Sequence, residues 1–77
     1  PFLSKTQIPY EITNDSKVEI LIYNNLGQII ESFNEGIKRK GLYCFIFDAS
    51  GLPQGIYFYS ICVNGKMIDS KKMALIK

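Results

Sequence analysis

The residue types that most often carry out chemistry in proteins are scarce in this chain. It contains no histidine, which is the side chain best suited to proton transfer near neutral pH. Its two cysteines, Cys44 and Cys62, have neither a CxxC spacing nor a histidine partner, which argues against a thiol nucleophile and a structural zinc site. We expect free thiols, and a disulfide between the two stays open because sequence does not fix cysteine geometry.

The acidic residues and the glycines give no catalytic pattern either. Glu31 and Glu35 would align on a helix, but we expect no helix there and hence no glycosidase-like pair of carboxylates. Gly51 and Gly55 flank Pro53 and are typical of a turn rather than of a phosphate-binding loop. The sequence therefore predicts a non-enzymatic protein with no catalytic residue, no metal and no cofactor.

Length and charge narrow the class of protein further. The 77 residues carry a net charge of +2, too small to indicate nucleic-acid binding, and form one domain over residues 1–77. The only basic run, Lys38-Arg39-Lys40, lies between Gly36 and Gly41 and is typical of a solvated loop. No apolar stretch is long enough to cross a bilayer, so we expect no stable membrane insertion. Because the chain begins at Pro1, we expect it to be excised from a larger secreted protein.

Short strands are the elements predicted throughout. Val18, Ile20 and Ile22 alternate with polar residues, which is the period of a half-buried strand. The pair Asn64-Gly65 between two alternating runs is a strong hairpin signal. We expect strands over residues 6–12, 17–23, 28–33, 42–48, 56–63 and 66–76, and a polar loop over residues 34–41. The spacing of the apolar residues in the run 28–33 would also suit a short helix.

The aromatic strands predict how the elements pack. We expect an immunoglobulin-like antiparallel β-sandwich of about six to seven strands, with aromatic inner faces. The inner residues would be Tyr43, Phe45 and Phe47 on one strand and Tyr57, Tyr59, Ile61 and Val63 on another. The same alternation turns a second apolar set outward, and such a surface can mark an interaction site. That outward set is Leu42, Cys44, Ile46, Ile56, Phe58 and Cys62.

Four blocks of residues, in order along the chain, resemble the type IX secretion system C-terminal sorting domain of type A, also called the Por secretion system tail. The first is Pro1-Phe2 with Thr6, Ile8, Tyr10 and Ile12, and the second is Val18-Glu19-Ile20-Leu21-Ile22-Tyr23-Asn24-Asn25-Leu26-Gly27-Gln28. The third is Phe47-Asp48-Ala49-Ser50-Gly51-Leu52-Pro53-Gln54-Gly55-Ile56-Tyr57-Phe58-Tyr59, and the fourth is Ser70-Lys71-Lys72-Met73-Ala74-Leu75-Ile76-Lys77.

The resemblance also implies which residues matter. Its structural motif positions are Leu26, Gly27, Gln28, Asp48, Gly55, Tyr57 and Gly65. The chain departs from the family at Phe47, where tryptophan is frequent, and at Ser60, where a cation is frequent. It also departs at Cys44 and Cys62, where polar residues are usual. The last three of these four positions are expected to face outward, so the departures leave the predicted fold intact.

The resemblance implies a function. Such tails direct a parent protein of a Gram-negative bacterium through the periplasm and then the type IX translocon, to the cell surface or the medium. The implied partners are the translocon, a sortase-like peptidase and the N-terminal cargo domain, with self-association left open. The residues that the translocon would recognise are Lys71, Lys72, Met73, Leu75, Ile76 and Lys77.

Two other interpretations stay open on the residues alone. The outward apolar set would also suit an extracellular Ig-like binding module for carbohydrate or a neighbouring domain, or a structural accessory that packs against the parent. Lys71 and Lys72 could likewise be ordinary charges that keep an edge strand soluble, although a free edge can also accept a partner strand.

Overall fold

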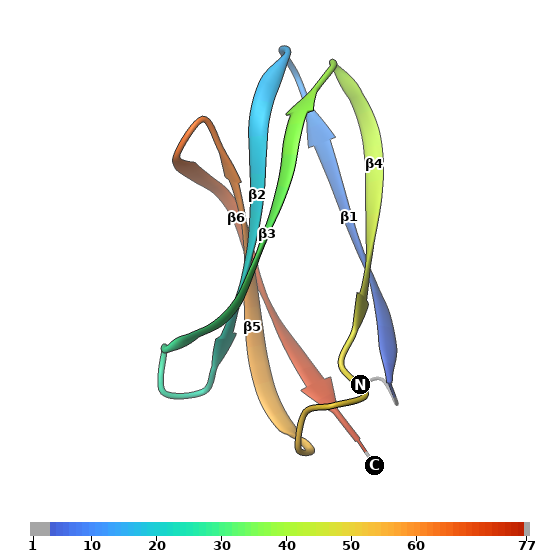
Figure 1. Ribbon diagram of the computed structural model, residues 1–77, viewed down its shortest axis with the longest axis vertical. Coiled ribbons are helices and arrows are strands. Elements are labelled where there is room, and N and C mark those ends of the chain that lie inside the picture. Colours follow the sequence, from blue (N-terminus) through green and yellow to red (C-terminus); the bar gives the residue numbers. More distant parts are fainter. Residues whose placement is uncertain (1–3, 77) are drawn as a thin grey trace.

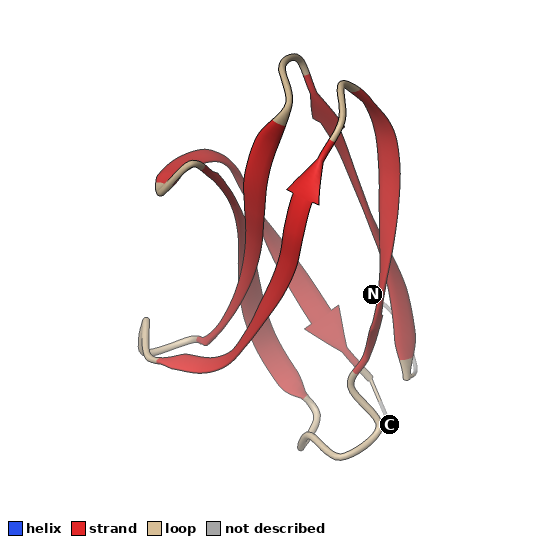
Figure 2. Cartoon of the chain, turned by 45° about the horizontal axis from the view of Figure 1, so that its top comes forward, coloured by secondary structure: helices blue, strands red, loops and turns tan. Residues whose placement is uncertain are grey.

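Six antiparallel strands and no helix make up the part of the chain that the computed structural model describes, residues 4–76 (Figures 1 and 2). The strands are β1 (Lys5–Ile12), β2 (Ser16–Asn24), β3 (Ile29–Lys38), β4 (Gly41–Asp48), β5 (Gly55–Val63) and β6 (Lys66–Leu75). They form two packed sheets, which confirms the predicted immunoglobulin-like sandwich. Pro1, Phe2 and Lys77, which belong to the first and last motif blocks, lie outside the described residues.

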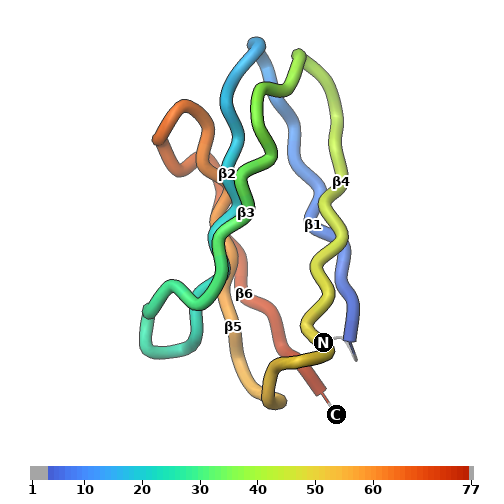
Figure 3. The backbone as a smooth tube through the Cα atoms, viewed as in Figure 1, coloured from blue at the N-terminus to red at the C-terminus, as the bar shows by residue number. Residues whose placement is uncertain are grey.

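The two sheets differ in size. One sheet has the strand order β3-β2-β5-β6, and the other contains only β1 and β4. Consecutive strands form the β2–β3 and β5–β6 hairpins, whereas β1 pairs with β4 and β2 pairs with β5 across intervening strands. The turn of the β5–β6 hairpin lies away from β1 and β4 (Figure 3). The smaller sheet therefore covers only part of the inner face of the larger one.

Branched aliphatic and aromatic side chains fill the space between the sheets. Ile8 of β1, Ile20 of β2, Phe47 of β4 and Ile61 of β5 are fully or almost fully buried. Burying one such side chain contributes roughly 1.5–3 kcal/mol. Tyr43 and Phe45 are half-buried and pack against this core, as the alternation predicted.

The loop predicted over residues 34–41 was wrong. β3 continues to Lys38 because Phe33 anchors it, with its ring 4.8 Å from that of Phe45 and 6.1 Å from that of Phe47. Glu35 is an extra residue in the ladder to β2, and Gly36 adopts a φ of 75° beside it. Glycine at a bulge takes this left-handed conformation without steric cost, so polar residues can continue an edge strand.

The basic run Lys38-Arg39-Lys40 was expected to lie in a loop, but only two of its three residues do so. Lys38 belongs to β3, and its Nζ lies 5.2 Å from the centre of the Tyr43 ring. Only Arg39 and Lys40 connect β3 to β4, and the Lys40 amide donates to Asp15 Oδ1 at 3.0 Å. This connection is therefore tied to the neighbouring β1–β2 turn.

Ser60 was expected to face outward, and it is nevertheless buried on that face of the sheet. Its exposed fraction is 0%, because Tyr23 of β2 covers it, with the two hydroxyl oxygens 2.9 Å apart. Cys44 is exposed as predicted, whereas Cys62 is half-buried. The two thiols are free and belong to different sheets.

Candidate recognition surface

β6 is an edge strand of the larger sheet. It pairs with β5 on one side only, in a register that sets Lys71 opposite Tyr59 and Met73 opposite Tyr57. An edge strand presents unpaired backbone amides and carbonyls to any molecule that reaches it. β6, which contains most of the fourth motif block, thus has an edge that a partner strand could pair with.

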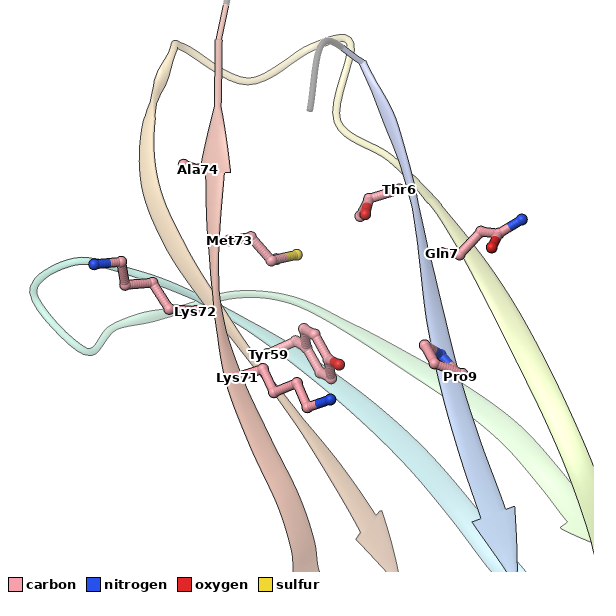
Figure 4. A pocket seen from close by; sticks show the side chains of 8 residues that line it. All are labelled: Thr6, Gln7, Pro9, Tyr59, Lys71, Lys72, Met73 and Ala74. Carbon is pink, nitrogen blue, oxygen red and sulfur yellow. The ribbon is translucent and has the colours of Figure 1, made fainter. Parts of the chain in front are cut away.

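The residues expected to be recognised do not share one surface. Lys71 and Lys72 are exposed and extend to opposite faces of β6 (Figure 4). Met73 and Leu75 have exposed fractions of 7% and 3% and belong to the core. Ile76 is exposed just beyond the strand, and Lys77 lies outside the described residues. Within this set, the side chains accessible to a partner are therefore those of Lys71, Lys72 and Ile76.

A groove of about 250 Å³ separates β6 from β1, the edge strand of the smaller sheet (Figure 4). Its lining includes Thr6, Gln7 and Pro9 from β1 and Tyr59, Lys71 and Met73 from β5 and β6. This volume lies below the roughly 300–1,000 Å³ typical of small-molecule sites. Sequence reasoning missed the β1 side of this groove, although a proline inside an alternating run is itself a signal of an edge strand.

Charge is distributed unevenly around the groove. Lys71 and Lys72 line it, and no carboxylate does so among the described residues. Asp69 lies next along β6, opposite Ile61, and its Oδ1 accepts the amide of Ser70 at 2.9 Å. Burial raises the pKa of the Tyr59 hydroxyl, and the charge of Asp69 raises it further. Tyr59 therefore stays a neutral phenol beside Lys71 (Figure 4).

The Leu26, Gly27 and Gln28 motif positions form the β2–β3 turn. Asn24 organises this turn, because its Oδ1 accepts the amides of Leu26 at 2.9 Å and Gln28 at 3.0 Å. Its Nδ2 also donates to Gln28 Oε1 at 2.7 Å, and the Gly27 amide donates to the Asn24 carbonyl at 3.1 Å. The hydrogen bonds of this motif are thus internal to the turn, and Asn24, which belongs to the second motif block, is the residue that organises them.

The other motif positions also make local structural contacts. Asp48 Oδ1 accepts the Ser50 amide at 2.9 Å, and hydrogen bonds from Ser50 lower the pKa of the Asp48 carboxyl. Gly55 starts β5, and Tyr57 donates from its hydroxyl to the Pro53 carbonyl at 2.7 Å. Gly65 completes the predicted β5–β6 turn.

Part of the outward apolar set is indeed exposed. Leu42 and Ile46 of β4 have exposed fractions of 81% and 51%, and the exposed Cys44 lies between them. On the larger sheet, Ile56 is exposed and Phe58 is half-buried. These side chains offer an exposed apolar surface for contact.

Residues 4–76 contain no group of three histidine, cysteine or acidic side chains able to hold a metal ion. Over the same residues there is no helix with the length and apolar character needed to cross a bilayer. The geometry that remains is an exposed strand edge, two lysines and a narrow groove, which suits recognition of a peptide.

Comparison with known proteins agrees with this assessment. The family model described as "secretion system C-terminal sorting domain" matches residues 1–77, the whole chain. No curated protein and no solved structure matches the chain. The chain belongs to the Por secretion tail family of C-terminal sorting domains, which are non-catalytic sorting signals for type IX secretion.

Proposed function

We propose that the type IX machinery recognises this domain through β6 and the residues around its end. The observation that carries this proposal is that β6 has one unpaired edge, with Lys71 and Lys72 exposed on the strand and Ile76 exposed just beyond it. Met73 and Leu75 contribute by anchoring the same strand in the core, which holds the exposed residues in a fixed register. Lys77 belongs to the proposed recognition set by sequence and lies outside the described residues.

A sorting domain of this family acts with the type IX machinery and directs secretion across the outer membrane to the cell surface or the extracellular space. The finer steps belong to the proposal. Residues 1–77 are a single sorting unit attached to an N-terminal cargo domain, and the cargo passes through the periplasm of a Gram-negative bacterium. A sortase-like peptidase then processes the exported protein, and the sorting domain itself has no catalytic role.

Export of a reporter tests the proposal. Residues 1–77 are fused behind a periplasmic fluorescent reporter in a bacterium that has the type IX system. We expect the reporter in the medium or on the cell surface, and we expect deletion of residues 71–77 to leave it in the periplasm. Retention of the full fusion in the periplasm despite a folded domain would contradict the sorting role.

Charge reversal separates recognition by the lysines from mere solubility. We expect the double variant K71E/K72E to reduce export by about tenfold, because each reversal replaces an attraction to the partner with a repulsion. The matched control is K66E, which reverses an exposed lysine at the other end of β6. Equal export by K66E and K71E/K72E would show that these lysines only keep the edge soluble.

A further inference from the structure

The direction of the backbone groups in β5 follows from one hydrogen bond. The amide of Asn64 donates to the carbonyl of Lys17 at 2.8 Å, so the backbone hydrogen-bonding groups of Asn64 point toward β2. Amide and carbonyl groups of successive strand residues point to alternate sides. Phe58 lies six residues before Asn64, an even number, so its backbone groups also point toward β2. The backbone groups of its neighbours Tyr57 and Tyr59 therefore point toward β6.

The same alternation divides β6. Lys71 lies opposite Tyr59 and Met73 lies opposite Tyr57, so the amides of Lys71 and Met73 are used in the ladder to β5. The amides of Ser70, Lys72 and Ala74 consequently point to the free edge. The outer edge of β6 thus offers a row of donors at every second residue.

The hairpin half of this edge is protected against pairing. The Ser70 amide is already accepted by Asp69 Oδ1 at 2.9 Å. Closer to the turn, the ladder between β5 and β6 has a bulge. Asp69 and Met67 lie opposite two consecutive residues of β5, so Ile68 between them has no partner in the ladder. Side-chain charges and bulges are the usual means by which proteins prevent unwanted strand pairing.

The other half of the edge has neither kind of protection. The β5–β6 ladder is regular from Asp69 to Leu75. No side chain among residues 4–76 accepts the amide of Lys72 or Ala74. This segment contains no proline, and it therefore remains competent to pair with another strand.

The edge across the groove is not competent in this way. Pro9 lies in the middle of β1, opposite Cys44 of β4. Proline has no amide hydrogen and is tolerated in a ladder only where its nitrogen faces away from the paired strand. The edge of β1 that faces away from β4 therefore lacks a donor at its centre, and β6 is the better template of the two.

Both faces of the unprotected segment are bordered by space for side chains. On the inner face, Met73 and Thr6 border the groove of about 250 Å³ between β6 and β1. On the outer face, Ile56, Ala74 and Ile76 border a shallow apolar depression of about 400 Å³. Because strand side chains alternate between two faces, an added strand would place successive residues into these two spaces.

We propose that residues 72–76 are a strand-addition site, and that an extended segment of the type IX machinery joins the larger sheet there as a fifth strand. The added segment of the partner carries apolar side chains on alternate positions. It also carries an acidic residue beside Lys71 or Lys72, because no carboxylate lines the groove next to these two lysines. This inference rests on the proposed role of β6 in recognition and specifies how that recognition occurs.

The test removes one outward amide without altering a charge. A74P deletes the donor at the unprotected half of the edge, and A74V keeps it while adding a side chain of comparable size. S70P and S70T form the same pair in the protected half, where the amide is already capped. We expect export of the reporter fusion to fall by about tenfold in A74P relative to A74V, and S70P to export within about twofold of S70T.

Urea unfolding of the isolated domain checks that each variant is folded. If A74P does not fold, K72P compared with K72A replaces the pair at the neighbouring outward amide, because both variants lose the same charge and only K72P loses the amide. Amide hydrogen exchange gives a second measurement that needs no variant: the Lys72 and Ala74 amides should exchange much faster than that of Met73. Slow exchange at Ala74 would overturn the inference, as would export of a folded A74P at the level of A74V.

The outcomes distinguish the proposal that β6 is recognised from the proposal that recognition occurs by strand addition. If K71E/K72E stops export but folded A74P and K72P do not, β6 is recognised through its side chains and strand addition is wrong. If the unaltered fusion is not exported, both proposals are wrong. Equal losses in A74P and S70P would also overturn the restriction to residues 72–76.

Discussion

The hydrogen bond between Tyr23 and Ser60 should respond differently to removal of each partner. The two hydroxyl oxygens lie 2.9 Å apart across the β2–β5 pair, and Ser60 is fully buried whereas Tyr23 is half-buried. Ser60→Ala removes the buried hydroxyl itself, so it should cost about 0.5–1.5 kcal/mol, the net value of a hydrogen bond. Tyr23→Phe leaves that hydroxyl buried without a partner and should cost about 1–3 kcal/mol.

The double variant gives the sharper result. With both hydroxyls gone no polar group is left unpaired, so Y23F/S60A should be less destabilised than the sum of the single variants. The domain's 77 residues at roughly 0.05–0.15 kcal/mol each give a free energy of unfolding of about 4–12 kcal/mol, so these changes are measurable.

Urea unfolding at fixed pH is the assay, with thermal midpoints as a check at about 4–8 °C per kcal/mol. Two results would refute the reasoning. One is a larger loss in S60A than in Y23F, and the other is additivity of the two changes to within about 0.3–0.5 kcal/mol.

Three further predictions concern the core, a turn and the acid range. Phe47→Ala should cost about 3–5 kcal/mol in urea unfolding, because Phe47 is 1% exposed; a loss below about 1 kcal/mol would mean that the core collapses around the gap. Gly65→Ala should cost about 1–2 kcal/mol because Gly65 has a φ of 82° with nothing near its Cβ position, whereas Gly51→Ala, equally open but without that φ, should be nearly neutral. The pKa of Asp48 is lowered by hydrogen bonds from Ser50, so its contribution to stability is present above its unfolded pKa and is lost as pH falls through the folded pKa. Asp48→Asn should therefore flatten the loss of stability between about pH 5 and about pH 2, and an unchanged acid profile would contradict this.

Most of the fold follows from period-two patterns in the sequence. The alternation in β2, β4 and β5 identified the inner residues, and Asn64-Gly65 identified the hairpin between β5 and β6. The end of β3 could not be predicted in this way, because polar residues on an edge strand need no apolar partner and Gly36 imitates a loop signal. The burial of Ser60 was not predicted, because alternation gives the face of a residue but not which neighbour covers it.

The recognition surface was only half predictable. Sequence could locate the strand and its lysines, but not the opposite directions of Lys71 and Lys72 or the position of β1 across the groove. Strand order results from pairings between distant segments, which no local pattern encodes. The direction of each amide at the edge of β6 likewise depended on the register with β5 and on the contact between Asn64 and Lys17.

The strand order has a kinetic consequence. Among the strands that the structure describes, only those of the β2–β3 and β5–β6 hairpins are paired neighbours in the chain, and isolated hairpins form in about 1–10 μs. The β1–β4 and β2–β5 pairings must wait for long loops to close, and small domains dominated by such pairings fold in about milliseconds to seconds. We expect a transient state in which β5 and β6 are already paired while β1 and β4 are still searching for each other. In that state the β5–β6 hairpin, which carries the proposed export signal, would be formed before the rest of the domain. A partner that binds at this stage would pair with the edge of β6 before the core has packed.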